Sequence, residues 1–162
     1  MRILPADPGH RLIVNVDGAA RGNPGPAGIG VTVADEDGRL VAERAEGIGH
    51  ATNNQAEYRA ALAGLALAAE QGATAVILRS DSRLLVEQLA GRYRVKDPIL
   101  RRLHEEARRV MVAFEDVSFE HVPREQNAEA DRLANIGIDD WLDTEVGRAY
   151  RRPEPPPQLF EE

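Results

Sequence analysis

The sequence predicts an α/β fold in which one mixed β-sheet carries helices on its faces. Residues 11–17 alternate apolar and polar side chains, which is typical of a half-buried strand. Residues 52–72 form an alanine-rich stretch with helical spacing, and the following residues 74–81 are continuously apolar in the middle. A strand, a helix and a buried strand in succession indicate a parallel pair of strands.

The first part of the chain predicts three antiparallel strands. The strand over 11–17 is followed by residues 18–30, which contain five glycines and two prolines and therefore predict a turn-rich connection. Residues 30–34 and 39–46 are short extended runs on either side of the hairpin turn Asp35–Gly38.

The second part of the chain predicts alternating helices and strands. Asn53 or Asn54 is the expected cap of the first helix, whose small residues recur at three- and four-residue spacing and permit close packing on a sheet. The remaining expected elements are a short helix over 82–90, a longer helix from Pro98, a strand over 117–122 and a last helix from Asn127.

The chain length of 162 residues is expected for one folded domain with a short extension. We assign residues 1–141 to that domain, because apolar residues make up 43% and charged residues 29% of the chain, close to globular averages. Residues 142–162 include a proline-rich, charged stretch without periodicity, and they are expected to be a tail or linker without regular structure.

Composition excludes several kinds of site. The chain has no cysteine, so disulfides, thiolate nucleophiles and cysteine metal sites are absent, and any metal must bind oxygen or histidine. There is no apolar run of membrane-spanning length and no secretory signal, so we expect a cytoplasmic protein without a membrane partner. The formal net charge of −7 does not favour nucleic-acid binding, although it averages over all faces.

Four acidic residues fall where the predicted elements meet. Asp17 ends the first strand and Asp81 ends the buried parallel strand. Glu57 is expected in the first turn of the first helix, and Asp131 in the first turns of the last. Ligands of open α/β sheets collect at the carboxyl ends of such strands. Four carboxylates converging there repel one another unless cations neutralise them, and oxygen ligands suit Mg²⁺.

Each acid also has a structural alternative. Asp17 could belong to a turn with Gly18, Glu57 could interact with the helix dipole, Asp81 could cap the helix that follows, and Asp131 could be a surface acid. Each alternative is reasonable for one residue alone. The joint placement of all four favours a metal site.

Four segments resemble the signature blocks of the type 1 ribonuclease H family, in the same order and with similar spacing. They are VDGAARGNPGPAGIG, TNNQAEYRAAL, LRSDSRLLVEQL and HVPREQNAEADRLAN, and the resemblance covers residues 11–137. It implies a five-stranded mixed sheet of order 3-2-1-4-5. It also implies a metal-dependent endonuclease that hydrolyses the RNA strand of RNA–DNA hybrids and leaves 5′-phosphate and 3′-hydroxyl ends.

By this resemblance, Asp17, Glu57, Asp81 and Asp131 are the metal ligands and hold two Mg²⁺ ions with substrate, with Mn²⁺ as a possible substitute. The resemblance also assigns substrate contacts that distinguish RNA through its 2′-hydroxyl groups and bind a phosphate of the DNA strand. These residues are Asn23, Thr52, Asn53, Asn54, Ser82 and Arg83. Their structural alternatives are a tight turn at Asn23 and helix capping at Asn53 or Asn54.

Two departures from the family stand out. Arg124 occupies the place where many members carry a mobile-loop histidine, so we include Arg124 in the catalytic set and expect His121 to be structural. Residues 91–97 replace a lysine-rich helical protrusion that grips the hybrid in some members. The resemblance therefore implies weaker, more salt-sensitive substrate binding here.

Two other functions stay open at this stage. One is a related metal-dependent nuclease or integrase that cuts duplex RNA or DNA, and the other is a non-catalytic module that binds hybrids. The chain is expected to be a monomer, and some relatives continue into a C-terminal fusion domain.

Overall fold

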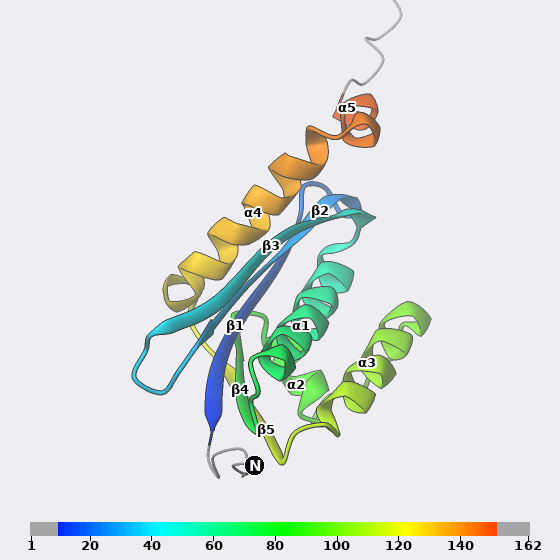
Figure 1. Cartoon of the computed structure of the whole chain (residues 1–162). Coiled ribbons are helices and arrows are strands. Elements are labelled where there is room, and N and C mark those ends of the chain that lie inside the picture. The colour runs from blue at the N-terminus through cyan, green and yellow to red at the C-terminus, as the bar shows by residue number, and fades with distance from the viewer. Residues whose placement is uncertain (1–9, 152–162) are drawn as a thin grey trace, which may run out of the picture.

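The computed structural model describes residues 10–151, and its helices pack on both faces of one sheet (Figure 1). None of the described helices combines the length and apolar character needed to cross a membrane. The elements in chain order are β1 (Arg11–Ala20), β2 (Gly25–Ala34), β3 (Leu40–Ala51), α1 (Asn53–Glu70), β4 (Ala75–Ser80), α2 (Arg83–Leu89), α3 (Pro98–Met111), β5 (Asp116–His121), the 3₁₀ helix η1 (Arg124–Asn127), α4 (Ala128–Leu142) and α5 (Glu145–Arg151).

The sheet has the strand order β3-β2-β1-β4-β5, which confirms the order expected from the family resemblance. Strands β1 to β3 are antiparallel, whereas β4 runs parallel to both β1 and β5. The last residue pair of β1 and β4 is Asn15 with Arg79. Asp17 and Asp81 each follow this pair by two residues, so the parallel register brings both acids to the same level of the sheet.

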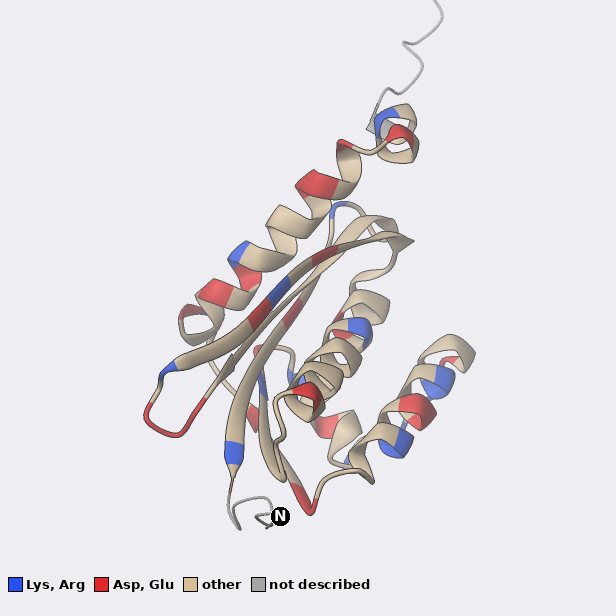
Figure 2. Ribbon diagram, viewed as in Figure 1, with Lys and Arg blue, Asp and Glu red and all other residues tan. Residues whose placement is uncertain are grey.

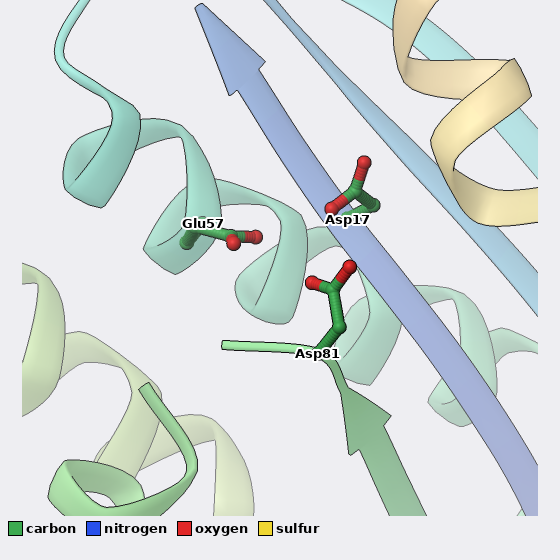
Figure 3. A group of neighbouring side chains, drawn as sticks. All are labelled: Asp17, Glu57 and Asp81. Carbon is green, nitrogen blue, oxygen red and sulfur yellow. The ribbon is translucent and has the colours of Figure 1, made fainter. Parts of the chain in front are cut away.

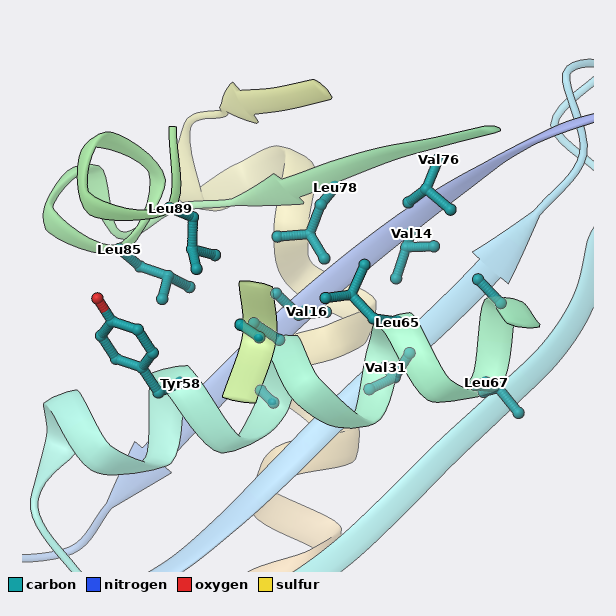
Figure 4. Close-up of a cluster of buried hydrophobic side chains, with 14 of the residues drawn as sticks. Val14, Val16, Val31, Tyr58, Leu65, Leu67, Val76, Leu78, Leu85 and Leu89 are labelled. Atoms are coloured by element: carbon teal, nitrogen blue, oxygen red, sulfur yellow. The ribbon is translucent and has the colours of Figure 1, made fainter. Parts of the chain in front are cut away.

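The core between the sheet and α1 forms because both surfaces present apolar side chains. Val14 and Val16 of β1 and Leu65 of α1 are fully buried there (Figure 4). A Cβ at Gly64 would lie 2.7 Å from a methyl carbon of Val16, so the absence of a side chain lets α1 lie close to the strand. Helix α4 covers the other face, over β2 and β3 (Figure 1).

The glycine-rich segment forms strands rather than the turn-rich connection that its composition predicts. β1 continues to Ala20 and β2 begins at Gly25, so only four residues connect them. Glycine is needed in β2 because α4 lies against it: a Cβ at Gly28 would come within 2.4 Å of the Ala134 carbonyl oxygen, and one at Gly30 within 2.0 Å of the Ala130 oxygen. These two glycines therefore serve helix packing.

The cap of α1 also differs from the prediction. Thr52, not Asn53 or Asn54, is the N-cap, because its hydroxyl oxygen accepts a hydrogen bond from the Gln55 backbone N–H at 3.1 Å. The Gln55 side chain in turn accepts from the Thr52 N–H at 3.0 Å and completes a capping box. Asn53 and Asn54 are thus left as the first two residues of the helix.

The expected tail is partly helical. Helix α4 continues to Leu142, and α5 spans Glu145–Arg151 within the segment predicted to lack regular structure. The ring of Tyr150 lies 6.0 Å from the Trp141 ring and 5.5 Å from the His50 ring, so these aromatic contacts hold α5 against the fold. The rest of the predicted tail, 152–162, lies outside the described residues.

The close contact between Gly30 and α4 gives a test of this packing. Replacing Gly30 with Ala is expected to lower the free energy of unfolding by about 3 kcal/mol, because the added Cβ overlaps helix backbone that cannot yield locally. Urea unfolding measures the loss. Gly38→Ala is the control: Gly38 has a φ of 85° and no atom near its Cβ position, so backbone strain alone should cost about 1 kcal/mol. Equal losses in the two variants would contradict the packing argument.

Candidate metal centre

Three carboxylates from three elements converge at the edge of the sheet where β1 and β4 meet. Asp17 lies on β1, Glu57 on α1 and Asp81 directly after β4, and their side chains turn toward a common space (Figure 3). One carboxylate oxygen of each lies within 4.8 Å of those of the other two. Asp17 is only 5% exposed, and Glu57 and Asp81 are half-buried, so the cluster is not a fully solvated acidic surface.

Gly18 brings α1 close enough to complete this cluster. A Cβ on Gly18 would lie 2.1 Å from the Ala56 carbonyl carbon, so no other residue type permits this approach. The Gly18 backbone N–H donates to Glu57 Oε1 at 2.8 Å and fixes the direction of that carboxylate. The residue next to Asp17 therefore positions Glu57.

Asp131 enters the same cavity from α4. The cavity has a volume of about 440 Å³ and is lined by all four predicted acids. Asn127, which is buried, holds the start of α4 against β1, since its Nδ2 donates to the Val16 carbonyl at 2.9 Å and its Oδ1 accepts from Asn15 Nδ2 at 3.0 Å. The sequence analysis treated Asn127 only as a helix start. Its buried amide is a positioning group that the helix pattern does not reveal.

The electrostatics of the cluster reflect burial and mutual repulsion. Burial, followed by the nearby Glu57 and Asp81 carboxylates, raises the pKa of Asp17 to about 9. Burial also raises the pKa of Glu57 to about 8, although the hydrogen bond from Gly18 acts in the opposite direction. The pKa of Asp81 is raised by burial, against the lowering effect of the Arg124 guanidinium. The free protein therefore disfavours a full set of negative charges at this site.

The donor set fits a hard divalent cation. Carboxylate oxygens are the ligands that Mg²⁺ and Mn²⁺ accept, and the described residues bring neither a sulfur nor an imidazole into the three-acid group. A bound cation would offset the repulsion that raises these pKa values. The residues present thus suit such an ion.

The structure removes the structural alternatives for Asp17 and Glu57. Asp17 does not form a turn with Gly18, because both lie inside β1 and Asp17 pairs with Gly30 of β2. Glu57 follows the N-cap Thr52 by five residues and lies beyond the first turn of α1. The expected first-turn position was wrong, and a role in satisfying the helix dipole does not account for this acid.

The alternatives for Asp81 and Asp131 fail as well. Ser82, not Asp81, caps α2, since its hydroxyl accepts from the Leu85 backbone N–H. Arg132 forms an ion pair with Glu129 rather than with Asp131. Both acids are left facing the cavity.

The predicted substrate residues divide into two groups. Asn23 Oδ1 accepts from the Asn53 N–H at 2.9 Å, and Asn53 Oδ1 accepts from the Ala20 N–H at 3.0 Å, so the connection after β1 is joined to the start of α1. Asn53 also lines the cavity. Within residues 10–151, no hydrogen-bond partner is found for either side-chain nitrogen, so these two amides present N–H donors.

The other predicted substrate residues lie at helix starts outside the cavity lining. Thr52 and Ser82 each use the hydroxyl oxygen to cap a helix, and each retains an O–H that can donate. Asn54 and Arg83 are exposed at the first turns of α1 and α2.

Arg124 and His121 both line the cavity. His121 ends β5, pairs with Ser80 of β4, and places its Nε2 3.2 Å from the Asp81 carbonyl oxygen. The sequence predicts a structural histidine inside a strand. Its position at the carboxyl end of a strand parallel to β4 is the signal that could have placed it beside Asp81.

Comparison with known proteins agrees with this geometry. A protein-family model described as "Reverse transcriptase-like" matches residues 15–137. The chain is 47% identical over 138 residues to Ribonuclease HI of Halobacterium salinarum, covering 85% of this chain and 69% of that protein. It is also 45% identical to the bifunctional protein Rv2228c of Mycobacterium tuberculosis, over 80% of this chain and only 36% of that protein.

Solved structures give the same assignment. The crystal structure of RNase H1 from Halobacterium salinarum superposes with a TM-score of 0.79 at 48% identity, covering 80% of this chain and 98% of that one. LC11-RNase H1 in complex with an RNA/DNA hybrid superposes with a TM-score of 0.78 at 42% identity, covering 82% of this chain and 99% of that one. On the family match, the identity and the shared sheet, this chain belongs to the type 1 ribonuclease H family of hydrolases.

Proposed function

We propose that this protein hydrolyses the RNA strand of RNA–DNA hybrids in a metal-dependent reaction that leaves 5′-phosphate and 3′-hydroxyl ends. The observation that carries the proposal is the close cluster of Asp17, Glu57 and Asp81, with Asp131 in the same cavity. Relatives named ribonuclease H, and one solved in complex with an RNA/DNA hybrid, support the choice of substrate.

In this proposal the four carboxylates hold two Mg²⁺ ions, or Mn²⁺ in their place. When bound, such a pair lowers the pKa of the attacking water and stabilises negative charge on the departing 3′-oxygen. Asp17 is central because it lies beside the other three acids. Glu57 is held by Gly18, and Asp131 by the anchoring of α4 through Asn127.

Arg124 is proposed to contact the phosphate under attack. Its guanidinium lies close enough to Asp81 to lower the pKa of that acid, and it lines the cavity. A cation there can stabilise charge that develops on the phosphate oxygens. His121 lines the same cavity and is proposed to assist proton transfer to the departing group.

Selection of RNA is proposed to rest on the amides of Asn23 and Asn53. Their carbonyl oxygens are engaged by backbone N–H groups, so their NH₂ groups can donate to the 2′-hydroxyl oxygens and base edges of the RNA strand. The exposed Asn54 and Arg83, and the hydroxyls of Thr52 and Ser82, extend this surface to both strands.

Replacing Asp17 with Asn tests the proposed reaction. The variant keeps the side-chain shape but loses a charge at the centre of the cluster, and we expect kcat on a hybrid to fall by at least about 100-fold. Strand-specific end labels show whether RNA alone is cut and which ends form. Asp37→Asn, in the exposed β2–β3 hairpin, is the matched control and should retain parent activity. Full activity of the Asp17 variant, or equal cutting of the DNA strand, would refute the proposal.

Asp17→Asn, which is expected to lower activity, should increase the stability of the metal-free protein. Without divalent ions, Asp17→Asn removes a buried acid that its neighbours repel, so the free energy of unfolding should rise by about 1 kcal/mol or more. Adding Mg²⁺ should raise the melting temperature of the parent protein and have little effect on the variant, because the ion binds the folded cluster. Thermal unfolding with EDTA and with Mg²⁺ measures both effects. If Mg²⁺ raises the melting temperatures of the Asp17→Asn variant and the parent protein equally, these acids do not form the ion site.

A further inference from the structure

The acidic chain carries one strongly basic region, between α2 and the end of α3. Residues 92–109 contain seven Arg or Lys side chains and three carboxylates, a net charge of +4 in a chain whose formal net charge is −7. Basic side chains lie at both ends of α3 (Figure 2). This concentration of charge is hidden in the overall composition.

Part of this region forms an open groove of about 420 Å³, which we call the arginine groove. It lies between residues 91–95 and α3, and four arginines line it: Arg92, Arg94, Arg101 and Arg108. Arg92 pairs with Glu87, but no carboxylate of residues 10–151 lies within 4.0 Å of the other three guanidinium groups. Glu105 also lines the groove, so four guanidinium groups face one carboxylate there, and this excess of positive charge favours anions.

The groove is rigidly connected to the metal centre. Gln88, which lines the groove and is 5% exposed, accepts a hydrogen bond from Tyr58 Oη at 2.6 Å and donates to the Arg94 carbonyl at 3.0 Å. Tyr58 is the neighbour of Glu57 on α1. Helix α2 begins two residues after Asp81 and has seven residues, about 10 Å of rise, which equals about three nucleotides along one strand.

We infer that the arginine groove binds backbone phosphates of the hybrid outside the cleavage site. This inference rests on the proposed function. Nucleic acid fits better than an acidic peptide, because Gln88 and Tyr58 connect the groove to the helix that carries Glu57, and its arginines can form paired hydrogen bonds to phosphate oxygens of a duplex bound at the metal centre. The arginine groove would then supply phosphate contacts in place of the lysine-rich protrusion, which is absent from residues 91–97.

The test is a triple variant, Arg94→Gln, Arg101→Gln and Arg108→Gln, assayed on a labelled hybrid at several salt concentrations. We expect KM to rise at least ten-fold with kcat nearly unchanged, and the slope of log KM against log salt to fall by about two to three, because each lost phosphate contact removes about 0.9. The control triple, Arg11→Gln, Arg39→Gln and Arg44→Gln, makes the same change in net charge elsewhere and should keep the parent slope.

The outcomes separate this inference from the proposed function. If the parent protein cleaves hybrids but the groove triple keeps the parent KM and slope, the groove does not bind the hybrid and an acidic protein becomes its better partner. If the groove variant and the control variant weaken binding equally, only net charge matters and the inference is wrong. A parent protein that fails to cleave hybrids would instead overturn the proposed function. Thermal unfolding confirms that the exposed substitutions leave the fold intact.

A second inference concerns Arg21, in the connection between β1 and β2. Its Nη1 donates to Asp139 Oδ1 at 2.7 Å, and its Nη2 donates to Asn135 Oδ1 at 3.2 Å, both on α4. Asn135 Nδ2 donates in turn to the Asp131 carbonyl at 3.0 Å. Arg21 therefore joins the connection that carries Asn23 to the helix that carries Asp131.

The geometry points to Arg21 as a positioning residue that holds Asn23 in register with the metal centre. It does so through α4 rather than by contacting phosphate, and this inference also rests on the proposed function. If Arg21 positions Asn23 through α4, removing Asp139 breaks that link and should raise KM. If Arg21 instead contacts phosphate, removing the neighbouring acid favours binding of an anion and should lower KM.

Arg21→Ala and Asp139→Ala are therefore each expected to raise KM for the hybrid about three-fold with kcat unchanged, and Asp140→Ala is the control that removes the same charge from the next residue. The exchange of Arg21→Asp with Asp139→Arg should restore much of the parent KM. A lower KM in Asp139→Ala, or equal effects of the Asp139 and Asp140 variants, would show that Arg21 acts through its charge alone.

Discussion

The structure depends on one electrostatic constraint: mutually repelling carboxylates, one buried and two half-buried, are brought together where β4 ends beside β1. The register of β1 and β4 brings Asp17 and Asp81 to one level, and the N–H of Gly18 holds Glu57 beside them. Raised pKa values are the cost of this arrangement in the free protein. A cation bound among these acids would neutralise them, and this links the fold to metal-dependent chemistry.

Much of the fold and the choice of acids could be predicted from sequence, because both depend on local pattern. Alternation of side chains predicts Val14 and Val16 in the core, and acids at expected strand ends identify Asp17 and Asp81, although β1 continues past Asp17 to Ala20. The strand order came from resemblance to a family, since periodicity alone does not fix which strands are neighbours.

The errors share a physical origin. Glycines at 28 and 30 were interpreted as turn residues, although they make room for a helix that lies about one hundred residues further along the chain. The position of His121 beside Asp81 was likewise not predicted, because only the β4–β5 register sets it. In each case the deciding contact is long-range, and no local pattern in the sequence records it.

The adjacent residues Glu57 and Tyr58 have a consequence for how such a protein can diverge. Glu57 points into the metal centre, and Tyr58 donates a hydrogen bond to Gln88, which lines the arginine groove. Exposed arginines can be exchanged during evolution without disturbing the core, so the proposed affinity of the arginine groove for duplexes can change quickly. Tyr58 and Gln88 cannot drift in this way, since losing either partner leaves a polar group of the other unsatisfied in the interior. Substitutions should therefore accumulate among the exposed arginines of the arginine groove, whereas Tyr58 and Gln88 should change little.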